Sequence, residues 1–212
     1  IIENSGASQA RKYALEKATG EYIGFVDGDD YIELNMFEKL YNKAVEENAE
    51  ISVCGYYRAT EKKLTKRGTH PYKCFGNDVF DEPSLFINNL PYIWNKIFKR
   101  ELIERENRTF EDLRIFEDLL FTYKLMLKAN KLTLVPEPLY YYRIDRQESL
   151  TSKFTEKRFD IFEASDNLIK YFKECNVFEY FEDELLFIVL KHIYVILETD
   201  VSKKEFKLKN KF

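Results

Sequence analysis

Hydrophobic and polar residues recur along the chain with two periods, and these predict helices and strands in turn. Residues 8–18 and 34–47 carry apolar side chains three and four residues apart, which predicts two amphipathic helices. Residues 22–26 form a short apolar run typical of a buried strand, and residues 50–58 alternate weakly, which predicts a second strand. The first third of the chain therefore alternates helix and strand.

The middle of the chain continues with shorter elements separated by turn residues. The segment 61–77 is charged and contains glycine and proline, so it predicts a β-hairpin or a loop. Beyond it the pattern predicts a short helix at 83–90, a strand or turn followed by a helix at 94–103, a loop at 105–113 and a helix at 117–129.

Two prolines interrupt the last apolar segment that has strand character. Residues 132–135 and 139–143 predict two strands, and Pro136 and Pro138 predict a turn between them. From Thr155 onward only long helical patterns occur.

This order of elements predicts the α/β fold class, with a mixed sheet flanked by helices and an α-helical C-terminal extension. The boundary is expected after residue 152, which divides the chain into 1–152 and a helical region 153–212. With 212 residues, of which 45% are hydrophobic and 16% aromatic, the chain is large and apolar enough to bury a core.

Charge and cysteine content exclude several classes of protein. The net charge of −4 does not indicate a nucleic-acid partner. The three cysteines are odd in number and widely spaced, so they match neither a disulfide framework nor a zinc site, and they fit a reducing, cytoplasmic compartment.

The start of the chain lacks a signal-peptide pattern. The longest apolar tract, 185–197, is shorter than the roughly 20 residues that a membrane span requires.

The end of the chain is basic. This tail is a solvated end, or else it contacts the anionic inner face of a membrane. Its lysines are Lys203, Lys204, Lys207, Lys209 and Lys211.

The most informative feature is a group of acidic residues at the end of the 22–26 strand. Asp27, Asp29 and Asp30 follow the strand directly, where an α/β sheet commonly binds its ligands. Neighbouring carboxylates repel one another unless they share a cation. Hard divalent cations are often held by one or two carboxylates together with substrate phosphates. The pattern therefore predicts a metal-assisted site for a phosphorylated ligand.

This acidic segment has three other interpretations. An EF-hand calcium loop would place Ile32 where that loop requires glycine. A haloacid-dehalogenase-like phosphatase would place its aspartates on the first strand, and here a helix precedes them. A solvated acidic turn that only closes the strand is the simplest alternative, because Asp and Gly favour turns.

Four sequence blocks extend the comparison beyond the acidic segment. An Asn-x-Gly-x-x-x-Ala-Arg pattern at 4–11 precedes Gly-Glu-Tyr-Ile-Gly-Phe-Val-Asp-Gly-Asp-Asp at 20–30. The later blocks are Trp94-Asn95-Lys96-Ile97-Phe98-Lys99-Arg100, Phe116-Glu117-Asp118 with Phe121, and Leu139-Tyr140-Tyr141-Tyr142-Arg143 with Ser149. Together they resemble the family 2 glycosyltransferases, whose fold is called GT-A. The resemblance spans most of the chain, although Lys12 stands where Asn is commoner.

The resemblance implies a transferase with a nucleotide-diphosphate sugar as donor, a UDP-sugar above all, and Mg²⁺ or Mn²⁺ as cofactor. Asp29 is the implied direct metal ligand, Asp27 would contact the ribose or the metal, and Asp30 would support them. Arg11 resembles the position that contacts the base. A surface helix arginine is the alternative interpretation of Arg11.

Two acidic residues at the start of the 117–129 helix are the catalytic candidates. An inverting transfer needs a general base beside the acceptor hydroxyl, and a carboxylate within hydrogen-bond reach meets that need. Asp118 is the expected base, with Glu117 supporting or replacing it. Both residues would also complement the positive end of a helix dipole without any catalytic role.

The remaining candidates surround the acceptor and the diphosphate. Trp94 is expected to stack on a sugar, or else to fill the core, and Lys96 is expected to support the acceptor side. Arg143 and Arg146 would bind the diphosphate through forked hydrogen bonds.

The resemblance implies metal-assisted transfer of a sugar to a glycan or lipid-linked acceptor during assembly of surface polysaccharide or cell-envelope glycan. The resemblance also implies that the N-terminal nucleotide-binding strands of this fold are missing before Ile1, which would leave a sheet edge open for self-association. A catalytically silent, self-associating domain is therefore the alternative from the binding class. A metal-dependent phosphohydrolase is the third.

Overall fold

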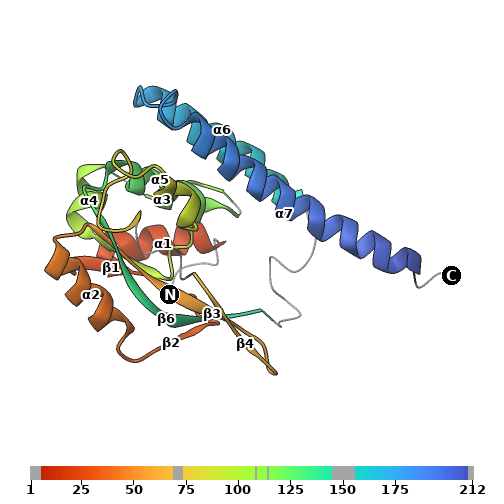
Figure 1. Cartoon of the computed structure of the whole chain (residues 1–212), viewed down its shortest axis with the longest axis horizontal. Coiled ribbons are helices and arrows are strands. Elements are labelled where there is room, and N and C mark those ends of the chain that lie inside the picture. The colour runs from red at the N-terminus through yellow and green to blue at the C-terminus, as the bar shows by residue number, and fades with distance from the viewer. Residues whose placement is uncertain (1–5, 69–73, 108, 114, 145–155, 210–212) are drawn as a thin grey trace.

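A mixed sheet of six strands forms the centre of the computed structural model, which describes residues 6–68, 74–107, 109–113, 115–144 and 156–209 (Figure 1). The strand order is β1-β5-β3-β6-β2, and β4 pairs with the outer end of β3. The strands are β1 (Tyr22–Gly24), β2 (Tyr31–Ile32), β3 (Ile51–Ala59), β4 (Leu64–Arg67), β5 (Lys96–Lys99) and β6 (Leu132–Arg143). The central pair β3–β6 is parallel and the other pairs are antiparallel. The expected mixed sheet is therefore confirmed.

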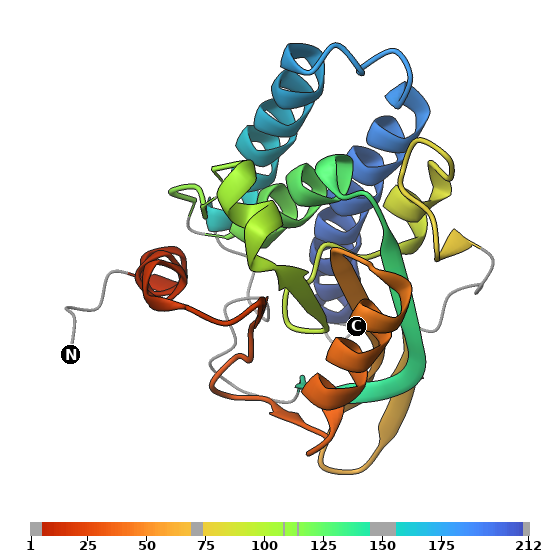
Figure 2. The same ribbon diagram turned by 90° about the vertical axis from the view of Figure 1, so that its left-hand side faces the viewer.

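Helices cover both faces of this sheet. Figures 1 and 2 show α2 on one side, α3, α4 and α5 on the other, and α6 and α7 as an outer pair beyond α5. The helices are α1 (Gly6–Lys17), α2 (Met36–Glu47), α3 (Ser84–Asn88), α4 (Arg100–Arg105), α5 (Glu117–Lys128), α6 (Asp160–Glu174) and α7 (Glu182–Lys209), with a 3₁₀ turn at Glu156–Phe159. All the helices expected from the hydrophobic period are present.

The two main helices bury different amounts of their surface for a physical reason. Met36, Leu40 and Ala44 recur every four residues in α2 and are fully buried, so this helix has one apolar face and one solvated face. In contrast, Glu117 and every residue from Leu119 to Leu127 of α5 are buried. Helix α5 lies between the sheet and α6, and its apolar side chains join those of Ile51 and Phe172 in one cluster.

The structure corrects the expectation of two strands and a proline turn at 132–143. Strand β6 runs through this segment without a break. Its pairing with β3 shifts register at Cys54/Gly55 and Gly55/Tyr56, opposite the prolines. Such an irregularity allows an extended strand to contain Pro136 and Pro138, which have no N–H to donate to the ladder.

Two further comparisons concern the segments between the main elements. The hairpin expected within 61–77 is formed by its first part, because β4 (Leu64–Arg67) pairs with the end of β3. Strand β2 was not expected, since a two-residue strand has no period to detect; it pairs with Tyr140 and Tyr141 of β6. This short pairing returns the chain to the sheet immediately after the acidic segment.

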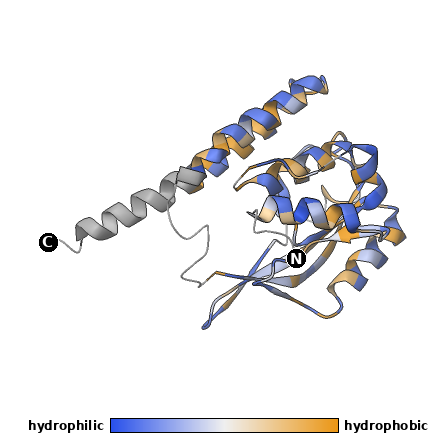
Figure 3. Ribbon diagram, turned by 180° about the vertical axis from the view of Figure 1, so that it is seen from behind, coloured by the Kyte–Doolittle hydropathy of each residue, from blue (hydrophilic) through white to orange (hydrophobic). Residues whose placement is uncertain are grey.

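The C-terminal helices complete the description. Helix α7 continues to Lys209, so most of the basic tail belongs to a helix. In its N-terminal half, Leu186, Leu190 and Tyr194 are exposed one turn apart, and Figure 3 shows apolar segments along this helix. None of the described helices is long and apolar enough to cross a membrane. The domain boundary expected after residue 152 lies outside the described residues and stays a prediction.

Candidate functional site

The acidic segment forms a tight turn between β1 and β2. The Asp30 N–H donates to the Asp27 carbonyl at 3.0 Å, which places Gly28 and Asp29 at the tip of the turn. Asp29 is exposed, whereas Asp27 and Asp30 are half-buried. The three carboxylates therefore have different surroundings.

The second acidic pair lies at the start of α5. The residue before it, Phe116, has φ 69° and ψ 14°, a left-handed conformation that is uncommon for a residue other than glycine. Such conformations persist where the surrounding structure holds them, and they are enriched at functional sites. Glu117 is buried, and Asp118 is half-buried with an oxygen that accepts the Leu119 N–H at 2.9 Å.

Arg11 on α1 joins the two acidic groups. One terminal nitrogen, Nη2, donates to Asp27 Oδ1 at 2.8 Å, and Nη1 pairs with Glu117 Oε1. The side chain of Arg11 is 20% exposed and that of Glu117 8% exposed, so this ion-pair network is largely shielded from solvent. The acidic turn and the start of α5 are therefore linked through Arg11. This arrangement was expected only in part, because Arg11 was assigned to the base of the donor.

Burial and neighbouring charges shift the acid–base properties of this site. Loss of solvation, together with the Glu117 carboxylate, raises the pKa of Asp118 to about 7, and Arg11 opposes the rise. Burial acts to lower the pKa of Arg11, but Asp27 and Glu117 outweigh burial and raise it. A carboxyl group with a pKa near neutrality beside a permanent cation is well suited to proton transfer.

Residue Asp30 is held by strand β6 on both carboxylate oxygens. The Tyr140 hydroxyl donates to Asp30 Oδ2 at 2.8 Å, and the backbone N–H of Arg143 donates to Oδ1 at 2.8 Å. Burial raises the pKa of Asp30, although both hydrogen bonds lower it. Tyr140 was not singled out from the sequence, where it is one of three consecutive tyrosines. Arg143 is exposed next to this carboxylate, and Arg146 lies outside the described residues.

The indole of Trp94 lies inside an aromatic layer. Tyr92, Tyr140 and Tyr142 stack on it with ring centroids 4.6, 4.4 and 5.7 Å away, and Tyr56 meets it edge-on at 4.9 Å. Trp94 is 5% exposed. The structure thus corrects the expectation that it stacks on a sugar, because tyrosine rings occupy the surface that a sugar would need.

The ammonium of Lys96 is also in the interior, which differs from the acceptor-side position expected of it. Its side chain is fully buried, and Nζ donates to the carbonyls of Leu90 and Tyr92, both at 2.7 Å, and to Asn95 Oδ1 at 2.8 Å. Burial lowers the pKa of Lys96 to about 7. Lys96 therefore stabilises the segment 90–95, which contributes Tyr92 and Trp94 to the aromatic layer.

Replacement of this lysine tests that role. Lys96→Met is expected to lower the free energy of unfolding by about 3 kcal/mol, because it leaves buried acceptors without a donor. Urea unfolding measures the change. Lys99→Met is the matched control on the same strand. Lys99 is half-buried, and its ion-pair partner at 3.5 Å, Glu101, is exposed to solvent. Equal losses for both variants would contradict the assignment.

The side chains at the acidic turn fit a divalent cation only in combination with a ligand. Within the described ranges, no three Asp, Glu, His or Cys side chains gather closely enough to hold a metal by themselves. Asp29 offers an exposed carboxylate of the hard oxygen type that Mg²⁺ and Mn²⁺ prefer. These cations commonly complete their coordination with water and substrate phosphates, so one or two protein ligands are sufficient.

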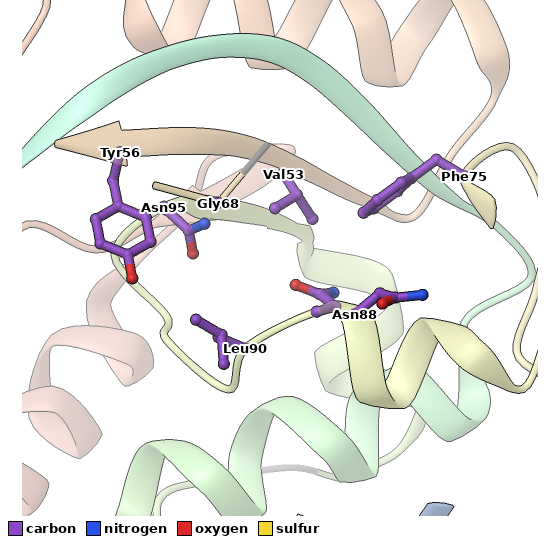
Figure 4. A pocket seen from close by; sticks show the side chains of 8 residues that line it. Val53, Tyr56, Gly68, Phe75, Asn88, Leu90 and Asn95 are labelled. Carbon is purple, nitrogen blue, oxygen red and sulfur yellow. The ribbon is translucent and has the colours of Figure 1, made fainter. Parts of the chain in front are cut away.

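A small cavity lies elsewhere, between β3, α3 and the segment that connects α3 to β5 (Figure 4). Its lining includes Val53, Tyr56, Asn88, Leu90 and Asn95, and its volume is ≈ 10 Å³. A cavity needs about that much space for a single water molecule. It therefore cannot hold a nucleotide, and none of the candidate residues named above line it.

Comparison with known proteins identifies the family of the chain. The family model described as "Glycosyl transferase family 2" matches residues 2–115. Glycosyltransferase EpsJ of Bacillus subtilis is 34% identical over 157 residues, which cover 70% of this chain and 44% of that protein. The cholesterol galactosyltransferase of Borreliella burgdorferi is 30% identical over 213 residues, which cover 92% of this chain and 59% of that protein. The chain thus spans about half the length of these relatives.

A solved structure shows the same fold. Residues 1–349 of Staphylococcus aureus TarS, crystallised in complex with UDP-GlcNAc, superpose with a TM-score of 0.65 at 21% identity. The match covers 77% of this chain and 46% of that one. From the family match, the sequence relatives and the shared fold, we conclude that the chain belongs to glycosyl transferase family 2.

Proposed function

We propose that this protein transfers a sugar from a nucleotide-diphosphate donor to a glycan or lipid-linked acceptor, with inversion at the anomeric carbon. The observation that carries the proposal is the position of Arg11, which joins the acidic turn to the start of α5. It brings the donor-side carboxylates and the candidate base to one site. Relatives named for glycosyl transfer and for teichoic acid biosynthesis support a role in the bacterial cell envelope or surface polysaccharide.

The donor end of the site is assigned to the acidic turn. Asp29 would ligate Mg²⁺ or Mn²⁺, with Asp27 and Asp30 beside it, and Arg143 would face the diphosphate. The bound cation supplies positive charge that stabilises the departing diphosphate. A UDP-sugar is the proposed donor, because the TarS structure with this fold was solved with UDP-GlcNAc.

The acceptor end of the site is assigned to the start of α5. Asp118 would accept the proton of the acceptor hydroxyl as the hydroxyl oxygen bonds to the anomeric carbon. The bond from this carbon to the diphosphate breaks, and its electron pair leaves with the diphosphate oxygen. Glu117 would act through Arg11, since their ion pair fixes the first turn of α5.

A lipid-linked acceptor would be met at a membrane surface. The sequence of the last turns of α7 contains Lys203, Lys204, Lys207 and Lys209, whose charge complements anionic lipid headgroups. We therefore assign the reaction to the cytoplasmic face of the membrane as part of this proposal.

The donor assignment is tested by calorimetry with UDP in the presence and absence of Mn²⁺. Asp29→Ala is expected to weaken Mn²⁺-dependent UDP binding at least tenfold, because it removes the proposed protein ligand of the cation. Asp183→Ala removes an exposed carboxylate at the start of α7 and serves as the control, with unchanged affinity.

The alternatives give different results in the same assays. If the wild-type protein binds no UDP with Mn²⁺, the donor site is silent, and the self-associating domain becomes the better interpretation. Steady hydrolysis of p-nitrophenyl phosphate without an acceptor would favour the phosphohydrolase instead.

A further inference from the structure

The hydroxyl of Tyr140 connects the two ends of the acidic turn. It accepts the backbone N–H of Asp27 at 3.2 Å and donates to Asp30 Oδ2 at 2.8 Å. The tip of the turn, Gly28-Asp29, therefore projects from a base whose first and last residues are held by a single oxygen atom. The carboxylates of Asp27 and Asp30 are both engaged, by Arg11 and by β6, while Asp29 is the exposed member of the group.

The position of this hydroxyl is determined by packing. Tyr140 is fully buried, and its ring stacks on Trp94 at 4.4 Å. Trp94 in turn stacks on Tyr92, whose carbonyl is held by the buried ammonium of Lys96. Strand pairing between Ile32 and Tyr140 fixes the chain on the other side of the turn. A buried side chain with few accessible rotamers holds its hydrogen-bond partners in one geometry.

We propose that Tyr140 is a positioning residue, whose hydroxyl holds residues 27–30 in the conformation that presents Asp29 to a divalent cation and the donor diphosphate. The inference rests on the proposed function, and it extends that function to a residue outside the acidic motif. It also assigns Trp94 and Lys96 a supporting role, because they hold the Tyr140 ring. Asp30 then acts as the anchor of the turn rather than as a direct ligand of the donor.

Tyr140→Phe tests the proposal, because it removes the hydroxyl and retains the ring that packs on Trp94. In the ligand-free protein, amide hydrogen exchange of Asp27 and Asp30 is expected to become about tenfold faster, since the Asp27 N–H loses its acceptor. In calorimetry with Mn²⁺, the dissociation constant for UDP is expected to rise about tenfold. Without Mn²⁺, UDP affinity is expected to stay within twofold of the wild type.

Tyr142→Phe is the matched control. Tyr142 lies on the same strand and stacks on the same indole, with centroids 5.7 Å apart. We expect wild-type exchange at residues 27–30 and wild-type UDP affinity for this variant. If Tyr140→Phe behaves like Tyr142→Phe in either measurement, the proposal is overturned.

A double variant distinguishes loss of the turn conformation from general destabilisation of the protein. If the hydroxyl acts through the turn, Tyr140→Phe combined with Asp30→Asn weakens UDP binding no further than the more severe of the two single variants. Independent, additive losses would refute the proposal. Failure of the wild-type protein to bind UDP would refute the proposed function instead, and the exchange comparison would still decide whether this hydroxyl holds the turn.

Discussion

Asp118→Asn is expected to reduce sugar transfer about 10³-fold and to leave Mn²⁺-dependent UDP binding within twofold of the wild type. The amide cannot accept the acceptor proton, and general-base catalysis typically contributes 10²- to 10⁴-fold. The comparison of turnover with calorimetry separates loss of chemistry from loss of the donor site. Asp112→Asn is the control, because Asp112 is an exposed carboxylate close to the same helix start, and its side chain is 74% exposed.

The pH dependence of the reaction follows from the same group. Burial raises the pKa of Asp118 to about 7, and a base must be deprotonated to act, so kcat/KM is expected to rise with pH through about 7. A rate that is constant between pH 5 and 8 would contradict the assignment of Asp118 as the base.

Asp118 also makes a stability prediction with a definite sign. Its pKa is about 7 in the folded protein and 3.8 as an ordinary value, so the folded state binds more protons between these pH values. The free energy of unfolding contributed by this group therefore falls as pH rises from about 4 to about 7. We therefore compare the melting temperature of Asp118→Asn with that of the wild type at each pH. The difference, variant minus wild type, is expected to be more positive at pH 8 than at pH 4. A destabilised variant at pH 8 would indicate a structural role instead.

Arg11→Met is expected to lower the free energy of unfolding by about 3 kcal/mol, because it leaves the buried Glu117 carboxylate without its cation. Turnover is expected to fall at least 10²-fold, since the acidic turn and the start of α5 lose their common contact and small displacements of reacting groups are costly. Urea unfolding and initial rates measure the two effects.

Two comparisons isolate the role of this guanidinium. Lys12→Met removes the next cation on α1, whose pair with Asp112 spans 3.5 Å at the surface, and we expect less than about 1 kcal/mol of destabilisation. Arg11→Lys keeps the charge but not the fork that serves Asp27 and Glu117 together, so it is expected to recover stability better than turnover. Equal losses of unfolding free energy in Arg11→Met and Lys12→Met would show that the shielded ion pairs of Arg11 stabilise the protein no more than a surface ion pair does.

Local sequence patterns were sufficient for most of the secondary structure. The 3.6-residue period identified α2 and α5, a short apolar run identified β1, and weak alternation identified β3, because burial of one face imposes a period on the sequence itself. The family motifs likewise marked Asp27, Asp29 and Asp118 from the sequence alone. Patterns failed where an element has no period of its own, as in the two residues of β2, or where local rules compete with the sheet, as in β6 around Pro136.

The contacts that organise the site depended on the tertiary structure. Arg11 and Glu117 are 106 residues apart in the sequence, and Tyr140 and Asp30 are 110 residues apart. No spacing rule relates such positions. Their partners follow from which segments pack together, because buried polar groups must find a hydrogen-bond partner within reach.

The chain alone was therefore enough to establish the family motifs, the succession of helices and strands and the acidic residues proposed to carry the chemistry, since these depend on neighbouring residues. Folding decided that Arg11 joins the two acidic groups, that Trp94 and Lys96 are interior and that the Tyr140 hydroxyl reaches both ends of the turn. Burial gives these side chains their roles, and burial is a property of the packed molecule.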